Sequence, residues 1–256
     1  MAAPPESPAV KLYNQGAEHF KKGELDQAIE FFKKAAEADK DFYRAWAYLG
    51  MAYAQKGQLD PAIEAYRKCI DIAPQYHKAF NNVGELYRRK GLLDYAAMVF
   101  KMATEIAPSL PHYFYNLGIT YFEIGMYAQA EDAFAQAANL DPKDFEYATE
   151  LAQVQFTQKK YDAAAETMAR FNDAHPEHDR APETRARLAM LRRLAEAQKA
   201  VSNAMDTGKM GLRKVEIDED ENSQTKVVEP LDDTPAQPFK AVPPQVGQDD
   251  PPKLED

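Results

Sequence analysis

The sequence predicts an all-α fold made of tandem helix pairs, and three periodic features indicate it. Eight of the eleven glycines form pairs seven residues apart, and each pair follows the last by 34 residues. Four prolines keep the same 34-residue step. Apolar residues recur at i, i+3, i+4 and i+7, as between Trp46 and Tyr53, which is one face of a helix. A fixed period of this length is typical of a repeat array.

The period divides residues 9–178 into five repeats with no insertion between them. The repeats run 9–42, 43–76, 77–110, 111–144 and 145–178. Because each repeat contains two helical stretches, separated in repeats one to four by a central glycine, each is predicted to be an antiparallel helix pair. One pair cannot bury its apolar face alone, so stacking of all five is expected to form a continuous core.

Glycine, aspartate and proline mark the ends of the predicted helices. The mid-repeat glycines suit a left-handed turn between the two helices, and they are Gly23, Gly57, Gly91 and Gly125. The glycines seven residues earlier let the second helix approach closely: Gly16, Gly50, Gly84 and Gly118. Four aspartates are expected to be N-caps of second helices, with Pro61 at the first helical position: Asp26, Asp60, Asp94 and Asp162. The prolines that end the second helices are Pro74, Pro108, Pro142 and Pro176.

The flanks of the array differ from it in composition. Residues 1–8 are predicted to be disordered. Residues 181–206 are predicted to form an eleventh helix that caps the open end of repeat five; its arginines also allow a dimerisation or docking helix. Residues 207–256 hold seven of the seventeen prolines and twelve acidic residues, which predicts a disordered, acidic, Pro-rich tail. That tail is interpreted as a solubilising segment, a short docking motif or a segment that folds back onto the repeats.

The consensus residues of the repeats resemble the tetratricopeptide repeat family. The second repeat reads Trp46-x2-Leu49-Gly50-x2-Tyr53, then Ala62-x3-Tyr66, then Pro74. Repeats three and four carry the same pattern, and repeats one and five depart from it, as terminal repeats do. The resemblance covers about two thirds of the chain. It implies a right-handed superhelical α-α solenoid whose first helices line a concave groove that binds other proteins.

Composition argues against several functions. The net charge of -10 and the pI near 5.1 disfavour nucleic acid as a partner. No apolar run reaches the roughly 20 residues of a membrane span, and the N-terminus has no secretory signal pattern, so a cytoplasmic, soluble protein is expected.

Cys69 is the one cysteine, which leaves no disulfide or cysteine metal cage. No catalytic or cofactor motif is present, so the chain is predicted not to be an enzyme and to need no cofactor; His175 and His178 are the weak support for an enzymatic or metal function.

The first helix of each repeat is predicted to place positions 4, 7, 8 and 11 in the core. The face beside the core, at positions 2, 5, 6, 9, 12 and 13, is predicted to line the groove. The candidate binding residues are Asn14, Arg44, Tyr48, Lys78, Asn81, Asn82, Arg88, Arg89, His112, Tyr115, Asn116 and Phe122. Three asparagines share position 6 and resemble the asparagine ladder with which tetratricopeptide proteins hold a peptide backbone. An amide suits this task because it both donates and accepts hydrogen bonds. The alternative is that asparagine is only a tolerated polar residue on an exposed helix.

The neighbours of the asparagines indicate what kind of ligand is selected. Four basic residues favour acidic groups: Arg44, Lys78, Arg88 and Arg89. Three aromatic residues favour apolar or aromatic groups: Tyr48, Tyr115 and Phe122. Glu146 and Glu150 make the groove acidic at repeat five. The lysine, asparagine and arginine pattern of tetratricopeptide domains that clamp a chaperone C-terminus is absent. Starting from repeat one, the corresponding residues are Tyr13, Ala17, Tyr48, Lys78 and Asn82, of which only the lysine fits.

Two functions follow for a non-enzymatic protein of this kind. The first is an interaction module or scaffold that binds an extended peptide or helix of another protein in the concave groove. The alternative is an assembly subunit that oligomerises, as a homodimer for example, through residues 181–206 and recruits partners through its acidic tail.

Overall fold

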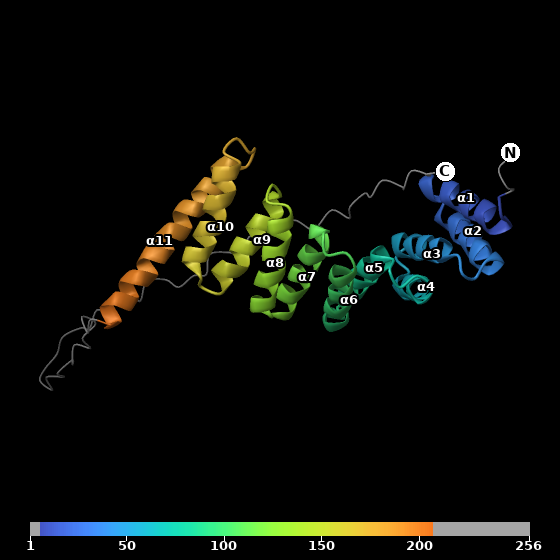
Figure 1. Ribbon diagram of the computed structural model, residues 1–256, viewed down its shortest axis with the longest axis horizontal. Coiled ribbons are helices and arrows are strands. Elements are labelled where there is room, and N and C mark those ends of the chain that lie inside the picture. Colours follow the sequence, from blue (N-terminus) through green and yellow to red (C-terminus); the bar gives the residue numbers. More distant parts are fainter. Residues whose placement is uncertain (1–5, 207–256) are drawn as a thin grey trace, which may run out of the picture. The chain divides into compact units, whose positions relative to one another are not determined.

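The computed structural model describes residues 6–206, and within that range it contains eleven helices and no strand (Figure 1). The first helices of the five repeats are α1 (Pro8–Lys21), α3 (Tyr43–Gln55), α5 (His77–Arg89), α7 (Pro111–Ile124) and α9 (Phe145–Thr157). The second helices are α2 (Leu25–Ala38), α4 (Leu59–Ile72), α6 (Leu93–Ile106), α8 (Tyr127–Leu140) and α10 (Tyr161–Ala174). Helix α11 (Ala181–Asp206) follows them. The predicted all-α fold of tandem helix pairs is confirmed.

Each helix packs on its neighbours in the chain, and glycine allows the closest of these contacts. A Cβ atom placed on Gly84 of α5 would lie 2.7 Å from the ring of Phe100 in α6. The three equivalent glycines face Phe32, Tyr66 and Phe134 in the same way. Repeat five has Ala152 at this position, and Met168 replaces the aromatic ring. A flexible methionine can yield to the extra methyl group where a rigid ring cannot.

The turn between the two helices of a repeat has a left-handed residue, as predicted. Gly23, Gly57, Gly91 and Gly125 have φ between 73° and 87°. The amide after each glycine bonds back to the first helix, as Gln58 N–H does to the carbonyl of Tyr53 at 2.9 Å. Repeat five keeps this turn although it has no glycine, because Lys159 adopts φ 59°.

The aspartates predicted as N-caps occupy a different position. Each second helix begins one residue before its aspartate, so that Asp60 is the second helical residue and Pro61 the third. The true N-cap residues, such as Gln58, accept no side-chain capping bond, because the backbone of the turn already fixes the helix start. The aspartates still lie in the first turn, where the helix dipole favours a negative charge.

Most of these aspartates form ion pairs to the following repeat or to α11. Asp26 pairs with Lys56, Asp60 with Lys90, and Asp162 with Lys199, the last at 2.7 Å. Asp94 is the exception: position 124, where a lysine would be needed, is Ile124, and Asp94 has no ion pair within residues 6–206. Because all these pairs are exposed, each contributes only modestly to stability.

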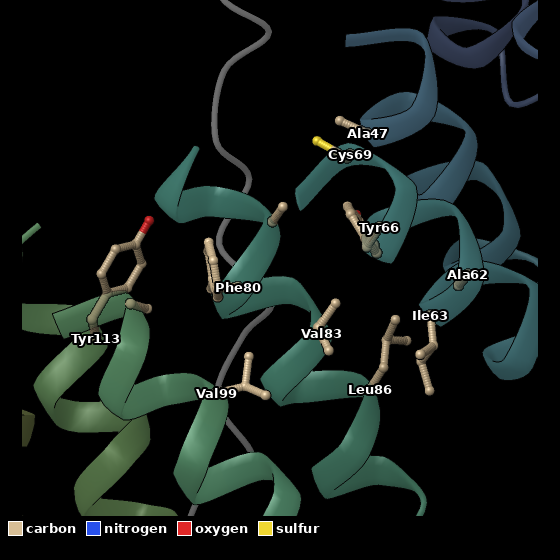
Figure 2. Close-up of a cluster of buried hydrophobic side chains, with 12 residues drawn as sticks. Ala47, Ala62, Ile63, Tyr66, Cys69, Phe80, Val83, Leu86, Val99 and Tyr113 are labelled. Atoms are coloured by element: carbon tan, nitrogen blue, oxygen red, sulfur yellow. The ribbon is translucent and has the colours of Figure 1, made fainter. Parts of the chain in front are cut away.

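The core extends over more positions of the first helix than the sequence predicts. Besides positions 4, 7, 8 and 11, repeats two to five bury positions 3 and 10, for example Ala79 and Leu86. Repeat one has exposed Lys11 and Glu18 there, because no other repeat packs on this side of it within residues 6–206. Figure 2 shows one cluster that joins α3 to α7, in which Leu86 of α5 lies beside Ile63 of α4.

The described chain begins close to the start of α1 and finishes with α11. The prediction of disorder for residues 1–8 is wrong at its C-terminal end, because α1 begins at Pro8. Ser7 caps this helix: its side chain accepts a 3.3 Å hydrogen bond from Val10 N–H. Helix α11 packs on α10 and buries Leu191 and Ala195. The predicted tail, 207–256, and residues 1–5 lie outside the described residues. No helix within 6–206 is long and apolar enough to cross a membrane.

Candidate functional site: the first-helix face

The first-helix face is the surface that the first helices α1, α3, α5, α7 and α9 form at the predicted groove positions, and its twelve candidate residues lie on α1, α3, α5 and α7. None of the twelve side chains is buried, so all are at least partly accessible to a ligand. Arg44, Lys78, Arg89 and His112 are exposed. The other eight are half-buried: Asn14, Tyr48, Asn81, Asn82, Arg88, Tyr115, Asn116 and Phe122. Tyr13, a further position-5 residue, is buried at 9% exposure and belongs to the core.

The three position-6 asparagines already make intramolecular hydrogen bonds. Asn82 Nδ2 donates to the hydroxyl of buried Tyr66 in the preceding repeat at 2.9 Å. Asn116 Nδ2 donates to Asn81 Oδ1 at 2.8 Å, and Asn14 Nδ2 donates to Glu6 Oε1 at 2.5 Å. Each bond fixes the amide and occupies one of its donors. Asn82 Oδ1 accepts no hydrogen bond within residues 6–206, so that acceptor remains available.

The basic residues divide into a paired one and three accessible ones. Arg88 bonds Glu85 through Nε at 3.1 Å and Glu123 of the next repeat at 2.8 Å. Burial alone would lower the pKa of Arg88, but these two carboxylates outweigh it and raise the pKa. Arg88 therefore joins repeats three and four, and its charge is compensated. The guanidinium of Arg44 lies over the ring of Tyr43, while Lys78 and Arg89 have no ion pair within the described residues.

Aromatic rings connect neighbouring repeats along the first helices. The centroids of Tyr13 and Tyr48 lie 5.2 Å apart between repeats one and two, and those of Tyr43 and Tyr76 lie 5.2 Å apart between the first and last residues of repeat two. His77 Nδ1 lies 2.6 Å from the hydroxyl of Tyr113, and Tyr115 lies 5.2 Å from Tyr147. Sequence reasoning missed Tyr43, Tyr76, His77, Tyr113 and Tyr147, which fall at positions 1, 3 and 34. Their clustering at repeat boundaries was the available signal.

Burial raises the pKa of several of these tyrosines, which keeps them protonated to higher pH. It is the main cause that raises the pKa of Tyr76 and of Tyr147, each to about 12. Burial, followed by Glu150 and Glu146, raises the pKa of Tyr115 as well. Since these phenols stay protonated near neutral pH, they offer hydroxyl donors rather than charges.

The acidic end of the face is partly neutralised by α11. Burial raises the pKa of Glu150, and Glu146 adds to this shift while Arg187 of α11 opposes it. Arg187 has its own pKa lowered, mainly by burial. Helix α11 thus brings a cation to the end of the first-helix face, which the sequence analysis did not foresee.

Other features of the surface lie away from this face. One hollow of about 400 Å³ lies over α4 and another of about 350 Å³ lies between α2, α3 and α4. Neither includes a candidate residue. The rings of His175 and His178 pack on Phe171, with centroids 5.2 and 5.4 Å away. Within 6–206, no three His, Cys, Asp or Glu side chains come together as a metal site.

Comparison with known families identifies the repeats. Residues 42–172, just over half of the chain, match the family described as the C-terminal domain of cilia and flagella-associated protein 70, a tetratricopeptide repeat region. Residues 9–42 match the tetratricopeptide repeat itself. The chain therefore belongs to the tetratricopeptide repeat family. Proteins of this family are generally interaction modules, which supports a role as a protein-interaction scaffold. No curated protein sequence matches the chain significantly.

Solved structures share this fold at low sequence identity. A crystal structure of MamA has 19% identity and a TM-score of 0.61, covering 66% of this chain and 92% of its own. PilF from Pseudomonas aeruginosa has 21% identity and a TM-score of 0.57, with 79% and 91% covered. YrrB, described as a TPR protein with an unusual peptide-binding site, has 19% identity and a TM-score of 0.58, with 70% and 93% covered. At such identity the likeness establishes the fold.

Proposed function

We propose that the protein is a non-enzymatic scaffold that binds an extended peptide or a helix of another protein on the first-helix face. The observation that carries this proposal is the group formed by Asn82 and Lys78 on α5. The Asn82 amide is held by Tyr66 and has a free Oδ1, while Lys78 is exposed one turn earlier on the same helix. A fixed amide acceptor beside an accessible cation suits a peptide N–H and an acidic side chain.

The charges along the face favour one orientation of the ligand. Arg44, Lys78 and Arg89 are the accessible cations, and they lie in repeats two and three. Glu146 is exposed in repeat five. An acidic portion of the ligand is therefore expected over repeats two and three, with neutral or basic residues toward repeat five. The peptide-binding site of YrrB gives a precedent for peptide recognition on this fold.

The experiment selects peptides from a random library on the intact protein and measures their affinity by calorimetry. We expect Arg44→Ala/Lys78→Ala to weaken the selected peptides by about tenfold or more, because two charge-assisted contacts are lost. The matched control, Lys33→Ala/Lys68→Ala, removes two lysines that line the hollow between α2, α3 and α4. Affinity unchanged in the first variant and lost in the control would refute the proposal.

A further inference from the structure

Helix α6 has an outward face unlike that of any other second helix. Tyr95, Met98 and Met102 are 56%, 54% and 43% exposed. The equivalent of Met98 is Glu30, Glu64, Asp132 or Glu166 in the other repeats, and the equivalent of Met102 is Lys34, Lys68, Gln136 or Arg170. In α2 these two positions form an ion pair, Lys34 to Glu30 at 2.6 Å. Only α6 replaces this polar pair by two methionines.

Asp94 and Lys101 are two exposed charges on the same outward face. Neither side chain makes a hydrogen bond or ion pair within residues 6–206. Asp94 is the aspartate left without its lysine, whereas Asp26, Asp60 and Asp162 are paired. The face thus carries an exposed apolar stripe and two unpaired charges of opposite sign.

Helix geometry places these residues in a self-complementary arrangement. At about 100° per residue, Met98 lies at the centre of the outward face, with Tyr95 and Met102 along one edge. Asp94 and Lys101 lie along the other edge. The two residues of each edge are about 10 Å apart along the helix, at about 1.5 Å per residue, and Met98 lies between them.

We propose that α6 of one copy packs antiparallel against α6 of a second copy, about a two-fold axis at Met98. Rotation about this axis reverses the direction of the helix but leaves each edge on the same side of the interface, so each edge faces its own copy running the opposite way. Tyr95 then meets Met102 of the second copy, and Asp94 meets Lys101 of the second copy. The symmetry repeats both contacts, so the apolar stripe is covered and all four charges are paired.

The neighbouring helices leave this face open. Helix α6 packs on α5 and α7, and its contacts with them involve the opposite side, where Ala96, Phe100 and Ala103 are buried. One helix against another buries less than the roughly 1,200 Å² of a standard interface. The dimer is therefore expected to be weak, with a dissociation constant of about 10 μM or higher.

Sedimentation equilibrium of the full chain, from 1 μM to about 1 mM, tests the dimer. Asp94→Lys and Lys101→Asp should each raise the dissociation constant by about tenfold, because each sets like charges opposite each other. The double variant Asp94→Lys/Lys101→Asp should return within about threefold of wild type. Within one chain these residues are too far apart to restore each other, so such a rescue requires a second copy.

Two further variants make the test independent of folding defects. Met98→Glu introduces the residue that Glu30, Glu64 and Glu166 provide at this position, so the fold is expected to tolerate it, and it should abolish the dimer. Glu64→Gln on α4 is the matched control and should leave the dimer unchanged. The proposal is overturned by a wild-type mass that stays monomeric throughout, or by a double variant without rescue. A dimer that resists Met98→Glu and is lost in Val201→Glu/Met205→Glu would place self-association on α11 and also overturn it.

Discussion

The side-chain amide of Asn82 donates a 2.9 Å hydrogen bond to the hydroxyl of Tyr66, and this bond joins repeats two and three. Tyr66 is buried, and the equivalent second-helix residues are Phe32, Phe100, Phe134 and Met168, which have no hydroxyl. The asparagine therefore satisfies a buried polar group that repeat two alone introduces. Its role in binding is limited to what the amide retains, which is Oδ1 and one N–H.

Removing Asn82 should destabilise the protein. In Asn82→Ala the buried Tyr66 hydroxyl loses its partner, which we expect to lower the free energy of unfolding by about 1–2 kcal/mol in urea titrations. Tyr66→Phe should cost less than about 1 kcal/mol, because phenylalanine is the residue of three other repeats. The double variant should cost no more than Asn82→Ala alone. Fully additive losses would show that the bond contributes nothing.

A methyl group at Gly84 should be tolerated only if the facing ring is replaced. Gly84→Ala places a Cβ atom 2.7 Å from the Phe100 ring and should cost about 2 kcal/mol of unfolding free energy. Gly84→Ala/Phe100→Met recreates the Ala152 and Met168 pair of repeat five. In the Phe100→Met background, Gly84→Ala should lower the free energy of unfolding by well under half of what it costs in the wild type. An equal cost in both backgrounds would contradict this account of repeat five.

The strained turn of repeat five should be improved by glycine. Lys159 has φ 59°, a conformation that glycine adopts without the steric cost of a side chain. Lys159→Gly is expected to raise the free energy of unfolding by about 0.5–1 kcal/mol, seen as a higher urea midpoint. Lys160→Gly is the adjacent control and should lower it, because Lys160 pairs with Glu131 at 2.6 Å.

Glu131 should make stability depend on pH. Burial alone would raise its pKa, but hydrogen bonds from Lys160, Gln158 and Gln155 outweigh burial and lower the pKa from its ordinary value of 4.5. The sign follows: the stabilisation is present above about pH 4.5 and is lost as pH falls through the lowered pKa. Glu131→Gln should be less stable than wild type at pH 7, and the difference should shrink toward pH 3.5. A difference that grows on acidification would contradict this.

The repeat architecture was predictable because its causes are local and periodic. The left-handed turn at Gly57 and the close approach at Gly84 follow from what glycine alone permits, and both were confirmed. Cys69 is buried, in agreement with its position in the repeat, where the other repeats mostly have alanine, and burial raises its thiol pKa to about 12.

What the sequence did not predict depends on the backbone bonds of the turn within a repeat and on contacts between repeats. Placing Asp60 as an N-cap was wrong, because the backbone bonds of the turn start the helix one residue earlier. The pairing of Arg88 with Glu123 and the approach of Arg187 to Glu150 join residues 35 and 37 positions apart, which no local pattern encodes. The charges available on the first-helix face were therefore overcounted.

Photo-crosslinking from two matched lysine positions shows which face of the protein the peptide contacts. A benzophenone amino acid replaces Lys78 on the first-helix face in one protein and Lys68 on α4 in another; both lysines are exposed. Each protein is irradiated with a peptide selected on the wild type. We expect the peptide to be crosslinked from position 78 and not from position 68. Crosslinking from position 68 alone would show that the ligand binds the second-helix side and would refute binding on the first-helix face.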